Sequence, residues 1–367
     1  MRIAFYAPLK PLDHEVPSGD RRIARLLFAA LRLAGHDPFI ASRLRSFDPV
    51  GRAFRQKKLA AHGRQAAARL IARWRARPDT APELWFTYHL YYKAPDWLGP
   101  AVAQALGIPY VVAEASVAMK RADGPWAAGH RAVVETLRQA SLVVGLNPTD
   151  REGVVPFVAP GAWAELPPFL DASLYRSATH ASGAASRLVT VAMMRPGDKL
   201  ASYRLLGSAL TRLLDLDWTL EVIGDGPARA EVEAALAPLG SRVRFVGEAD
   251  ETTVAARLAA ADLFVWPAIN EAFGMALLEA QASGLAVVAG KSGGVGAVVA
   301  DGETGLLVPP GDAAAFAAAV RRLLDDPAGR AALGAAARDK VGREHDIAPA
   351  AGRLSALIAG LRRIHAA

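Results

Sequence analysis

The chain has 367 residues, 52% of them hydrophobic, and this length and composition predict two domains, each with its own core. Lys and Arg outnumber Asp and Glu by 43 to 36, a net charge of +7, and the absence of cysteine excludes disulfides and thiolate metal sites. No run of about eighteen apolar residues occurs, so no membrane-spanning helix is expected. Residues 2–7 look like a first strand and not a secretory signal, so we expect a cytoplasmic protein.

Strands and helices alternate through the first half, which predicts a parallel sheet with crossover helices. The alternation stops at Pro167-Pro168, and the small, polar residues of Ser173–Ser186 indicate an interdomain linker. Strands are expected near 2–7, 37–41, 84–88, 109–113, 141–146 and 162–166, and helices near 20–34, 55–76, 95–106, 127–139 and 149–156.

A second alternating series follows the linker, and the end of the chain is helical. We therefore expect an α/β protein with a first domain at 1–172, a linker at 173–186, a second domain at 187–345 and a last helix at 346–367. Strands are expected near 188–193, 218–223, 242–246, 262–266, 286–289 and 305–308, and helices near 312–324, 327–342 and 347–365.

Basic residues are concentrated near the N-terminus, with fifteen Lys or Arg and only two acidic residues in 21–77. The part from Arg55 to Arg77 predicts an amphipathic helix with one apolar and one basic side. The basic side could be a solvated face, a contact for anionic lipid headgroups at the inner face of a membrane, or a contact for a phosphate-bearing acceptor. Nucleic acid is not expected as a partner, because no recognition module accompanies the charge. The apolar side contains Leu59, Ala60, Ala67, Leu70, Ile71 and Trp74, and the basic side Arg55, Lys57, Lys58, Arg64, Arg69 and Arg75.

The most informative stretch is 270–312, NEAFGMALLEAQASGLAVVAGKSGGVGAVVADGETGLLVPPGD. Glu271 and Glu279 are eight residues apart, and Phe273-Gly274 follows the first of them. A helix beginning near Gly274 would direct its free N–H groups and positive dipole end at an anion. Two carboxylates and open amides at this spacing suit a sugar attached to a nucleoside diphosphate.

This stretch resembles the C-terminal half of retaining GT-B glycosyltransferases of family 4. Their signature is Glu, seven residues, Glu, and this chain has E-A-F-G-M-A-L-L-E followed by S-G-G-V-G-A-V-V-A-D-G-E-T-G-L-L-V-P-P-G-D. The resemblance implies two Rossmann-like domains facing a cleft, with the C-terminal helix returning to the N-terminal domain. It also implies transfer of a sugar from a nucleoside diphosphate sugar to an acceptor hydroxyl, with retention of anomeric configuration. UDP is the default nucleotide and GDP the alternative.

Such a hexosyltransferase would act in the synthesis of a glycan, a glycolipid or a small glycoside. Two other functions remain open from the residues. One is a nucleotide-sugar-binding protein of the same fold that lacks transferase activity and is held at a membrane or partner. The other is a different GT-B chemistry, such as a nucleotide-sugar epimerase.

The resemblance assigns roles to the donor half, where ligands bind at the carboxyl ends of the strands. Glu271 would position the sugar, Glu279 would hold the ribose, and Arg195 and Lys199 would hold the diphosphate. Met193 stands where relatives place an arginine, so Arg195 is expected to replace it. The remaining donor-side residues are Gly224, Gly226, Asn270, Phe273, Gly274 and Met275, with Gly293-Gly294 at the rim.

The sequence also contains Asp215-Leu216-Asp217, a pattern that can hold a metal ion on a donor diphosphate. It precedes the strand expected at 218–223, which places it opposite the binding edge of the sheet. The histidines form no ligand spacing. We therefore expect no obligatory metal and no cofactor, with Arg195, Lys199 and helix amides neutralising the diphosphate.

The acceptor half offers fewer residues. Ser18-Gly19-Asp20 opens a helix after the first strand, so Gly19 could approach the cleft, while Asp20 could line it or cap the helix. His89 follows the strand 84–88 and should face the cleft, whereas His36 is expected to be structural. Relatives carry a histidine after the next strand, where this chain has Glu114, so either His89 or Glu114 would take over its part in acceptor chemistry.

Overall fold

The structure is a computed structural model that describes residues 1–13, 19–175 and 186–365. It divides into two compact units, one of Met1–Pro167 with Ala348–Ala367 and one of Pro168–Ile347. The domain bounds expected from sequence stay predictions. Ser18, most of the linker expected at 173–186, and the last two residues of the terminal helix lie outside the described residues.

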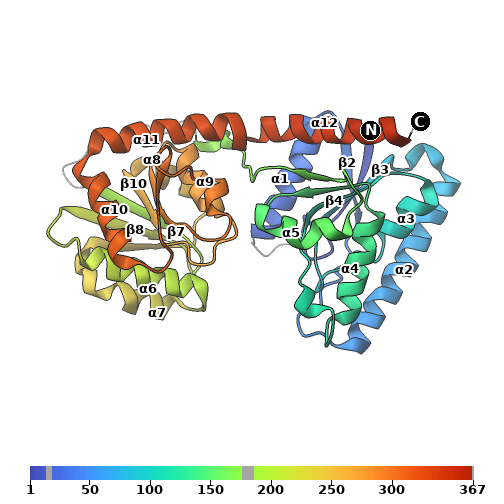
Figure 1. Ribbon diagram of the computed structural model, residues 1–367, viewed down its shortest axis with the longest axis horizontal. Coiled ribbons are helices and arrows are strands. Elements are labelled where there is room, and N and C mark those ends of the chain that lie inside the picture. Colours follow the sequence, from blue (N-terminus) through green and yellow to red (C-terminus); the bar gives the residue numbers. More distant parts are fainter. Residues whose placement is uncertain (14–18, 176–185, 366–367) are drawn as a thin grey trace. The chain divides into compact units, whose positions relative to one another are not determined.

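Unit 1 contains a six-stranded parallel sheet in the order β2-β1-β3-β4-β5-β6. Figure 1 shows helices on both faces of this sheet. The order reverses at β1, because β2 lies on one side of it and β3 on the other. The elements are β1 Arg2–Tyr6, α1 Gly19–Leu33, β2 Asp37–Ser42, α2 Ala53–Ala76, β3 Leu84–Leu90, α3 Gly99–Leu106, β4 Tyr110–Ala115, α4 Ala127–Gln139, β5 Leu142–Gly145, α5 Arg151–Val154, β6 Trp163–Glu165 and α12 Ile347–His365, with 3-10 turns η1 Pro78–Thr80, η2 Met119–Arg121, η3 Pro148–Asp150 and η4 Val155–Phe157.

Unit 2 contains a second six-stranded parallel sheet in the order β12-β11-β10-β7-β8-β9, which reverses at β7. Helices again cover it on both faces (Figure 1). The elements are η5 Ala172–Tyr175, β7 Ser186–Val191, α6 Asp198–Thr211, β8 Trp218–Ile223, α7 Arg229–Leu236, η6 Ala237–Arg242, β9 Val243–Gly247, α8 Glu251–Ala260, β10 Leu263–Trp266, α9 Met275–Ala282, β11 Val287–Gly290, η7 Val295–Ala297, β12 Gly305–Val308, α10 Ala313–Asp325, α11 Pro327–Lys340 and the π-helical turn η8 Val341–His345.

The sheets form because their strands are almost continuously apolar, as expected for parallel strands covered on both faces. All four residues of β5, β10 and β11 are buried, and β1 pairs with β3 so that Phe5 lies opposite Phe86. The rings of Phe5 and Phe86 stack with centroids 5.4 Å apart. The expected α/β class with two parallel sheets is confirmed. Within the described residues, no helix is both long and apolar enough to cross a membrane.

Two expected helices are wrong in detail. The helix expected at 149–156 is broken into η3, α5 and η4, because Pro148 and Pro156 each restrict the local backbone and Pro156 has no N–H to donate. The helix expected at 95–106 begins only at Gly99. Asp96 lies before it and accepts hydrogen bonds from the backbone N–H groups of Leu98 and Gly99, each at 2.8 Å.

Asp96 is the polar centre of the core of unit 1 and is only 3% exposed. Besides the two amides at the start of α3, its carboxylate accepts hydrogen bonds from Thr87 Oγ1 at 2.5 Å and Tyr110 Oη at 3.0 Å. Burial raises the pKa of Asp96 above its ordinary value, and these donors partly offset the rise. One side chain thus joins β3, β4 and α3.

We predict that Asp96→Ala destabilises the protein by about 2–4 kcal/mol, because it leaves four buried donors without their acceptor. Urea or thermal unfolding of the variant measures the loss. The exposed Asp123 in the η2–α4 loop supplies the control, since Asp123→Ala should change stability by less than about 0.5 kcal/mol. Equal effects of the two substitutions would contradict the role given to Asp96.

Candidate functional site

The predicted donor-side residues of unit 2 gather at the carboxyl edge of its sheet. Lys199 follows β7, Gly224 and Gly226 follow β8, Glu271 follows β10, and Gly293-Gly294 follows β11. These four strands are neighbours in the order β11-β10-β7-β8, and the chain direction across the sheet reverses at β7. Open α/β sheets bind ligands at such a switch point, because the loops there diverge.

Gly224 and Gly226 let the turn after β8 lie directly on the turn after β7. Their φ angles are +139° and +153°. A Cβ at Gly224 would lie 2.0 Å from the carbonyl oxygen of Ala192, and one at Gly226 would lie 2.3 Å from that of Met194. Only glycine permits both the backbone conformation and the close approach. The two loops are therefore a single packed layer at the strand ends.

The loop between β10 and α9 has an unusual backbone. Ala268 and Asn270, although not glycines, have φ angles of +54° and +50°, and Gly274 has +76° at the N-cap of α9. A Cβ at Gly293 would lie 2.1 Å from the carbonyl oxygen of Glu271. Non-glycine residues in this region cost energy and occur where a site holds a fixed geometry. The strain here is centred on Glu271.

Glu271 makes an ion pair with Lys199, whose ammonium group contacts its Oε2. The same oxygen accepts a 3.3 Å hydrogen bond from Trp266 Nε1, and the ammonium of Lys199 lies 5.4 Å from the centroid of the Trp266 ring. The side chains of Lys199 and Glu271 are 27% and 17% exposed, so both reach the surface while being largely shielded. Because Trp266 holds both side chains in place, either charged group can contact a ligand with little change in side-chain conformation.

A second set of contacts fixes this loop to the start of α6. Asn270 Nδ2 donates to Asp198 Oδ2 at 2.9 Å, and Asn270 N donates to Ser292 Oγ at 2.8 Å. Ser202 Oγ accepts from the backbone N–H of Ile269 at 3.0 Å. The first two turns of α6 therefore hold the loop through Asp198, Lys199 and Ser202.

The other residues predicted on the donor side differ in their solvent exposure. Arg195 and Met193 are exposed in the loop before α6. Phe273 and Glu279 are buried, at 6% and 4% exposure, whereas Met275 is half-buried at the first position of α9. The structure thus places Arg195 at the surface of the site and Glu279 beneath it.

Asp215 lies before β8, at the opposite edge of the sheet from the site. Its carboxylate is held by both terminal nitrogens of Arg321, at 2.7 and 2.8 Å, and this hydrogen bonding lowers the pKa of Asp215. In the part of the chain that the structure describes, no group of three or more His, Asp or Glu side chains is arranged to hold a metal ion.

In unit 1, acidic residues surround one histidine at the carboxyl ends of neighbouring strands. His89 Nδ1 lies 3.3 Å from Asp20 Oδ1, and Asp20 also lies 3.9 Å from Lys10 Nζ. His89 in β3 and Glu114 in β4 have φ angles of +62° and +58°, unusual for residues with a Cβ. Gly19 is the first residue of α1.

The charges in this cluster perturb one another. Burial alone would lower the pKa of His89, but contact with Asp20 and the nearby carboxylates of Glu114 and Asp150 raise it above its ordinary value. Burial raises the pKa of Glu114, against the effect of His89. Asp150 belongs to the same group, and its pKa is also raised by burial. These residues titrate as a coupled set with a protonation state that depends on all of them.

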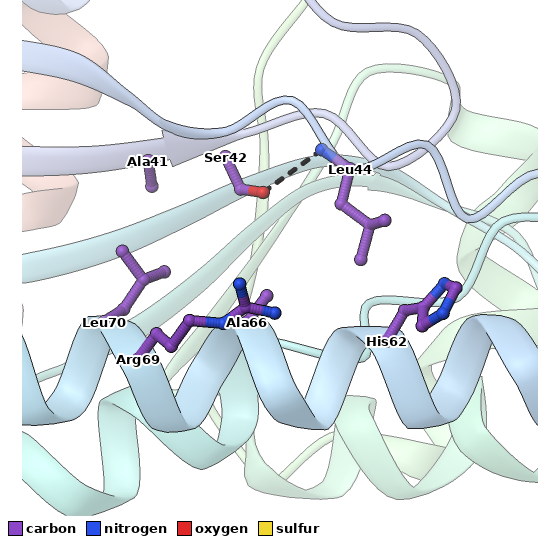
Figure 2. Close-up of a pocket in the computed structure, with 7 residues that line it drawn as sticks. All are labelled: Ala41, Ser42, Leu44, His62, Ala66, Arg69 and Leu70. Atoms are coloured by element: carbon purple, nitrogen blue, oxygen red, sulfur yellow. Dashed lines mark hydrogen bonds between the residues drawn. The ribbon is translucent and has the colours of Figure 1, made fainter.

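A separate hollow of about 370 Å³ lies between the end of β2 and α2 in unit 1. Figure 2 shows Leu44 pointing toward the helix, with Arg69 and His62 at its border. It contains no carboxylate and no residue of the strand-end cluster. It is therefore distinct from both groups of predicted site residues. Its lining consists of Ala41, Ser42, Leu44, His62, Ala66, Arg69 and Leu70.

Comparison with known proteins finds similarity in the second half of the chain. Residues 185–326 match the family described as Glycosyl transferases group 1. The chain is 38% identical to 2-deoxystreptamine glucosyltransferase of Streptomyces kanamyceticus over 154 residues, which are 41% of this chain and 40% of that protein. It is 44% identical to glycogen synthase of Mycobacterium tuberculosis over 103 residues, 28% of this chain and 25% of that protein. The chain thus spans between a quarter and two fifths of these relatives.

Solved structures match over the whole chain. Sucrose-phosphate synthase of Thermosynechococcus elongatus has a TM-score of 0.72 at 22% identity, with 99% of each chain covered. Anabaena HepE, solved in complex with UDP, has a TM-score of 0.74 at 16% identity, covering 98% of this chain and 100% of that one. The chain therefore has the GT-B fold of two Rossmann-like domains, and residues 185–326 within it are similar to glycosyl transferases group 1.

Several residues of these two groups were not predicted from the sequence. Trp266, Asp198, Ser202 and Ser292 support the Lys199–Glu271 pair, and Asp150 joins the acidic cluster. Trp266 ends its strand and Asp198 opens its helix, so the strand-end rule could have found both. The serines carried no signal, because their partners are distant in sequence.

We predict that Asp20→Asn lowers the pKa of His89, because it removes the carboxylate in contact with the ring. Following the His89 ring proton signal by NMR across pH measures the change, and Asp123→Asn, exposed in a loop, should leave it unaltered. Since the folded-state pKa is raised, protonation of His89 stabilises the protein below the unfolded-state value, and this is lost as pH rises through the folded-state pKa. An unchanged His89 titration would show that Asp20 does not control it.

Proposed function

We propose that the protein is a retaining glycosyltransferase that moves a sugar from a nucleoside diphosphate sugar to an acceptor hydroxyl. The observation that carries this proposal is the Lys199–Glu271 pair on Trp266, at the strand edge of a group 1 glycosyl transferase domain. It combines a cation suited to a diphosphate with a carboxylate suited to a sugar. UDP is the proposed nucleotide, a choice supported by Anabaena HepE, which was solved with UDP and with UDP-glucose.

In the proposed reaction the bond between the anomeric carbon and the diphosphate oxygen breaks while the acceptor oxygen attacks from the same face. The acceptor proton passes to the leaving phosphate oxygen. Negative charge grows on the diphosphate, where Lys199, Arg195 and the amides at Gly274 would stabilise it. Glu271 would lie by the sugar as it gains positive character, and Glu279 would hold the ribose. No metal ion or cofactor is proposed.

The acceptor would be contacted by unit 1, through His89 and Glu114. The relatives leave its identity open, because one is named for 2-deoxystreptamine and another is a D-inositol 3-phosphate glycosyltransferase, and each aligns over less than half of this chain. The product would be a glycan, a glycolipid or a small glycoside.

We predict release of free nucleoside diphosphate from a suitable nucleotide sugar, faster when the acceptor is present and undiminished in EDTA. The measurement is a panel of nucleotide sugars, first ranked by thermal shift and then assayed for released diphosphate. Anomeric configuration of the product by NMR tests retention. Donor binding without release under any acceptor would favour a binding protein that lacks transferase activity. Activity that EDTA abolishes and manganese restores would contradict the metal-free proposal.

We further predict opposite signatures for the two glutamates. Glu271→Gln removes charge beside the sugar and should lower turnover far more than affinity for free nucleoside diphosphate, because its contact grows in the transition state. Glu279→Ala should lower that affinity about ten- to a hundredfold through loss of a charged hydrogen-bond acceptor.

Calorimetry and steady-state kinetics separate the two effects. Because Glu279 is buried, Glu279→Gln serves as the variant that preserves packing, and Glu303→Ala, on an exposed turn, is the control for a lost carboxylate. Normal turnover of Glu271→Gln, or unchanged nucleotide affinity in folded Glu279→Ala, would remove the corresponding role.

A further inference from the structure

The start of α2 and the segment from η2 to α4 lie together in unit 1, and they contain none of the site residues described above. Gln56 Nε2 donates to the carbonyl oxygen of Pro125 at 2.7 Å, and Trp126 Nε1 donates to that of Asp48 at 3.3 Å. A Cβ at Gly51 would lie 2.6 Å from Pro125. The segments before α2 and before α4 are therefore held together, and Figure 1 shows both at the same end of the unit. We call this the α2–η2 surface, made of Val50, Arg52, Phe54, Lys57, Lys58, Met119 and Lys120.

The α2–η2 surface exposes large apolar side chains. Phe54 is 81% exposed, Met119 60% and Val50 55%, although they lie on a unit whose core is well filled. Val50 and Phe54 lie together at the start of α2, and Met119 lies in η2, whose Arg121 is 4.9 Å from the ring of Trp126, the residue that packs against Gly51. Exposed apolar residues that are grouped in this way mark interaction sites. Phe54 occupies the first turn of α2, so it projects from the helix end rather than from its packed side.

Positive charge adjoins this patch and continues along α2, which contains no acidic residue. Nine Lys and Arg lie between Gly51 and Pro78, and no Asp or Glu. All nine are exposed, and among the described residues only Arg55 has a carboxylate within 4.0 Å, that of Asp48 at 3.9 Å. The first turn of α2 has no acidic residue, so its free N–H groups and dipole add to the positive field.

Repulsion between these like charges lowers the stability of α2 unless an anionic group faces the helix. Basic residues three or four positions apart, such as Arg55 with Lys58 and Arg69 with Arg73, repel one another. The buried side of α2 consists of Gln56, Ala60, Gly63, Ala67 and Trp74, so packing holds the helix in place while the charged side stays free.

We propose that the α2–η2 surface docks the protein on an anionic lipid membrane. Phe54, Val50 and Met119 would enter the headgroup region, while Arg52, Lys57, Lys58 and Lys120 would contact lipid phosphates. Amphipathic surfaces with exposed apolar groups beside Lys and Arg bind in this way. Nucleic acid is the less favoured occupant, because no recognition module accompanies the charge. The proposal is independent of sugar transfer.

The test is sedimentation of the full chain with vesicles of pure phosphatidylcholine and of phosphatidylcholine containing phosphatidylglycerol. Binding should need the anionic lipid and weaken with salt. Each basic side chain near such a surface is worth about a fivefold factor in partitioning, so Arg52→Gln, Lys57→Gln and Lys58→Gln together should weaken binding about a hundredfold. Phe54→Ser should weaken it about tenfold or more.

Two matched controls separate a local surface from general properties. Leu33→Ser removes an apolar side chain that is 58% exposed at the end of α1, and it should change binding less than about twofold. Arg204→Gln, Arg212→Gln and Arg322→Gln remove the same charge from exposed positions of unit 2 and should have little effect.

Four outcomes would overturn the proposal. These are equal binding to neutral and anionic vesicles, binding to neither, equal losses in the control variants, and binding to RNA in place of vesicles.

Discussion

The ion pair between Lys199 and Glu271 is the interaction around which the candidate site of the second unit is arranged. It joins the start of α6 to the loop after β10. Trp266 contacts both members of the pair, through a hydrogen bond to Glu271 and a cation–π contact with Lys199. The strained residues Ala268 and Asn270 lie just before Glu271, and Gly293 approaches its backbone carbonyl closely. Strain of this kind persists only where surrounding contacts over-determine the geometry.

The two units place different charged side chains at the carboxyl ends of their strands. Both present side chains at the carboxyl ends of parallel strands where the strand order reverses, at β7 in unit 2 and at β1 in unit 1. Unit 2 places the cations Lys199 and Arg195 there, which suits a diphosphate. Unit 1 places Asp20, Glu114 and Asp150 around His89, which raises the pKa of that histidine. Acidic groups at this edge of unit 1 favour neutral or cationic ligands over phosphates.

Basic charge and acidic charge are also separated within unit 1. The acidic cluster lies at the strand ends, whereas the cations of α2 line an outer helix whose apolar side packs on the core. The positive net charge is therefore not a uniform property of the chain. It is a local field beside exposed Phe54, and such a field attracts anionic partners to this surface.

The sequence by itself determined the α/β class, the two parallel sheets and the placement of Glu271, Lys199 and His89 at strand ends, because strand periodicity and chain order are local properties. Only the tertiary structure decided which of these side chains meet. Lys199 and Glu271 are 72 residues apart, and Asp96 joins Thr87 to Tyr110 across two strands. The exposure of Phe54 and the nearness of Asp150 to His89 were likewise hidden. Distances between such groups follow from how helices and loops pack, which no local pattern records.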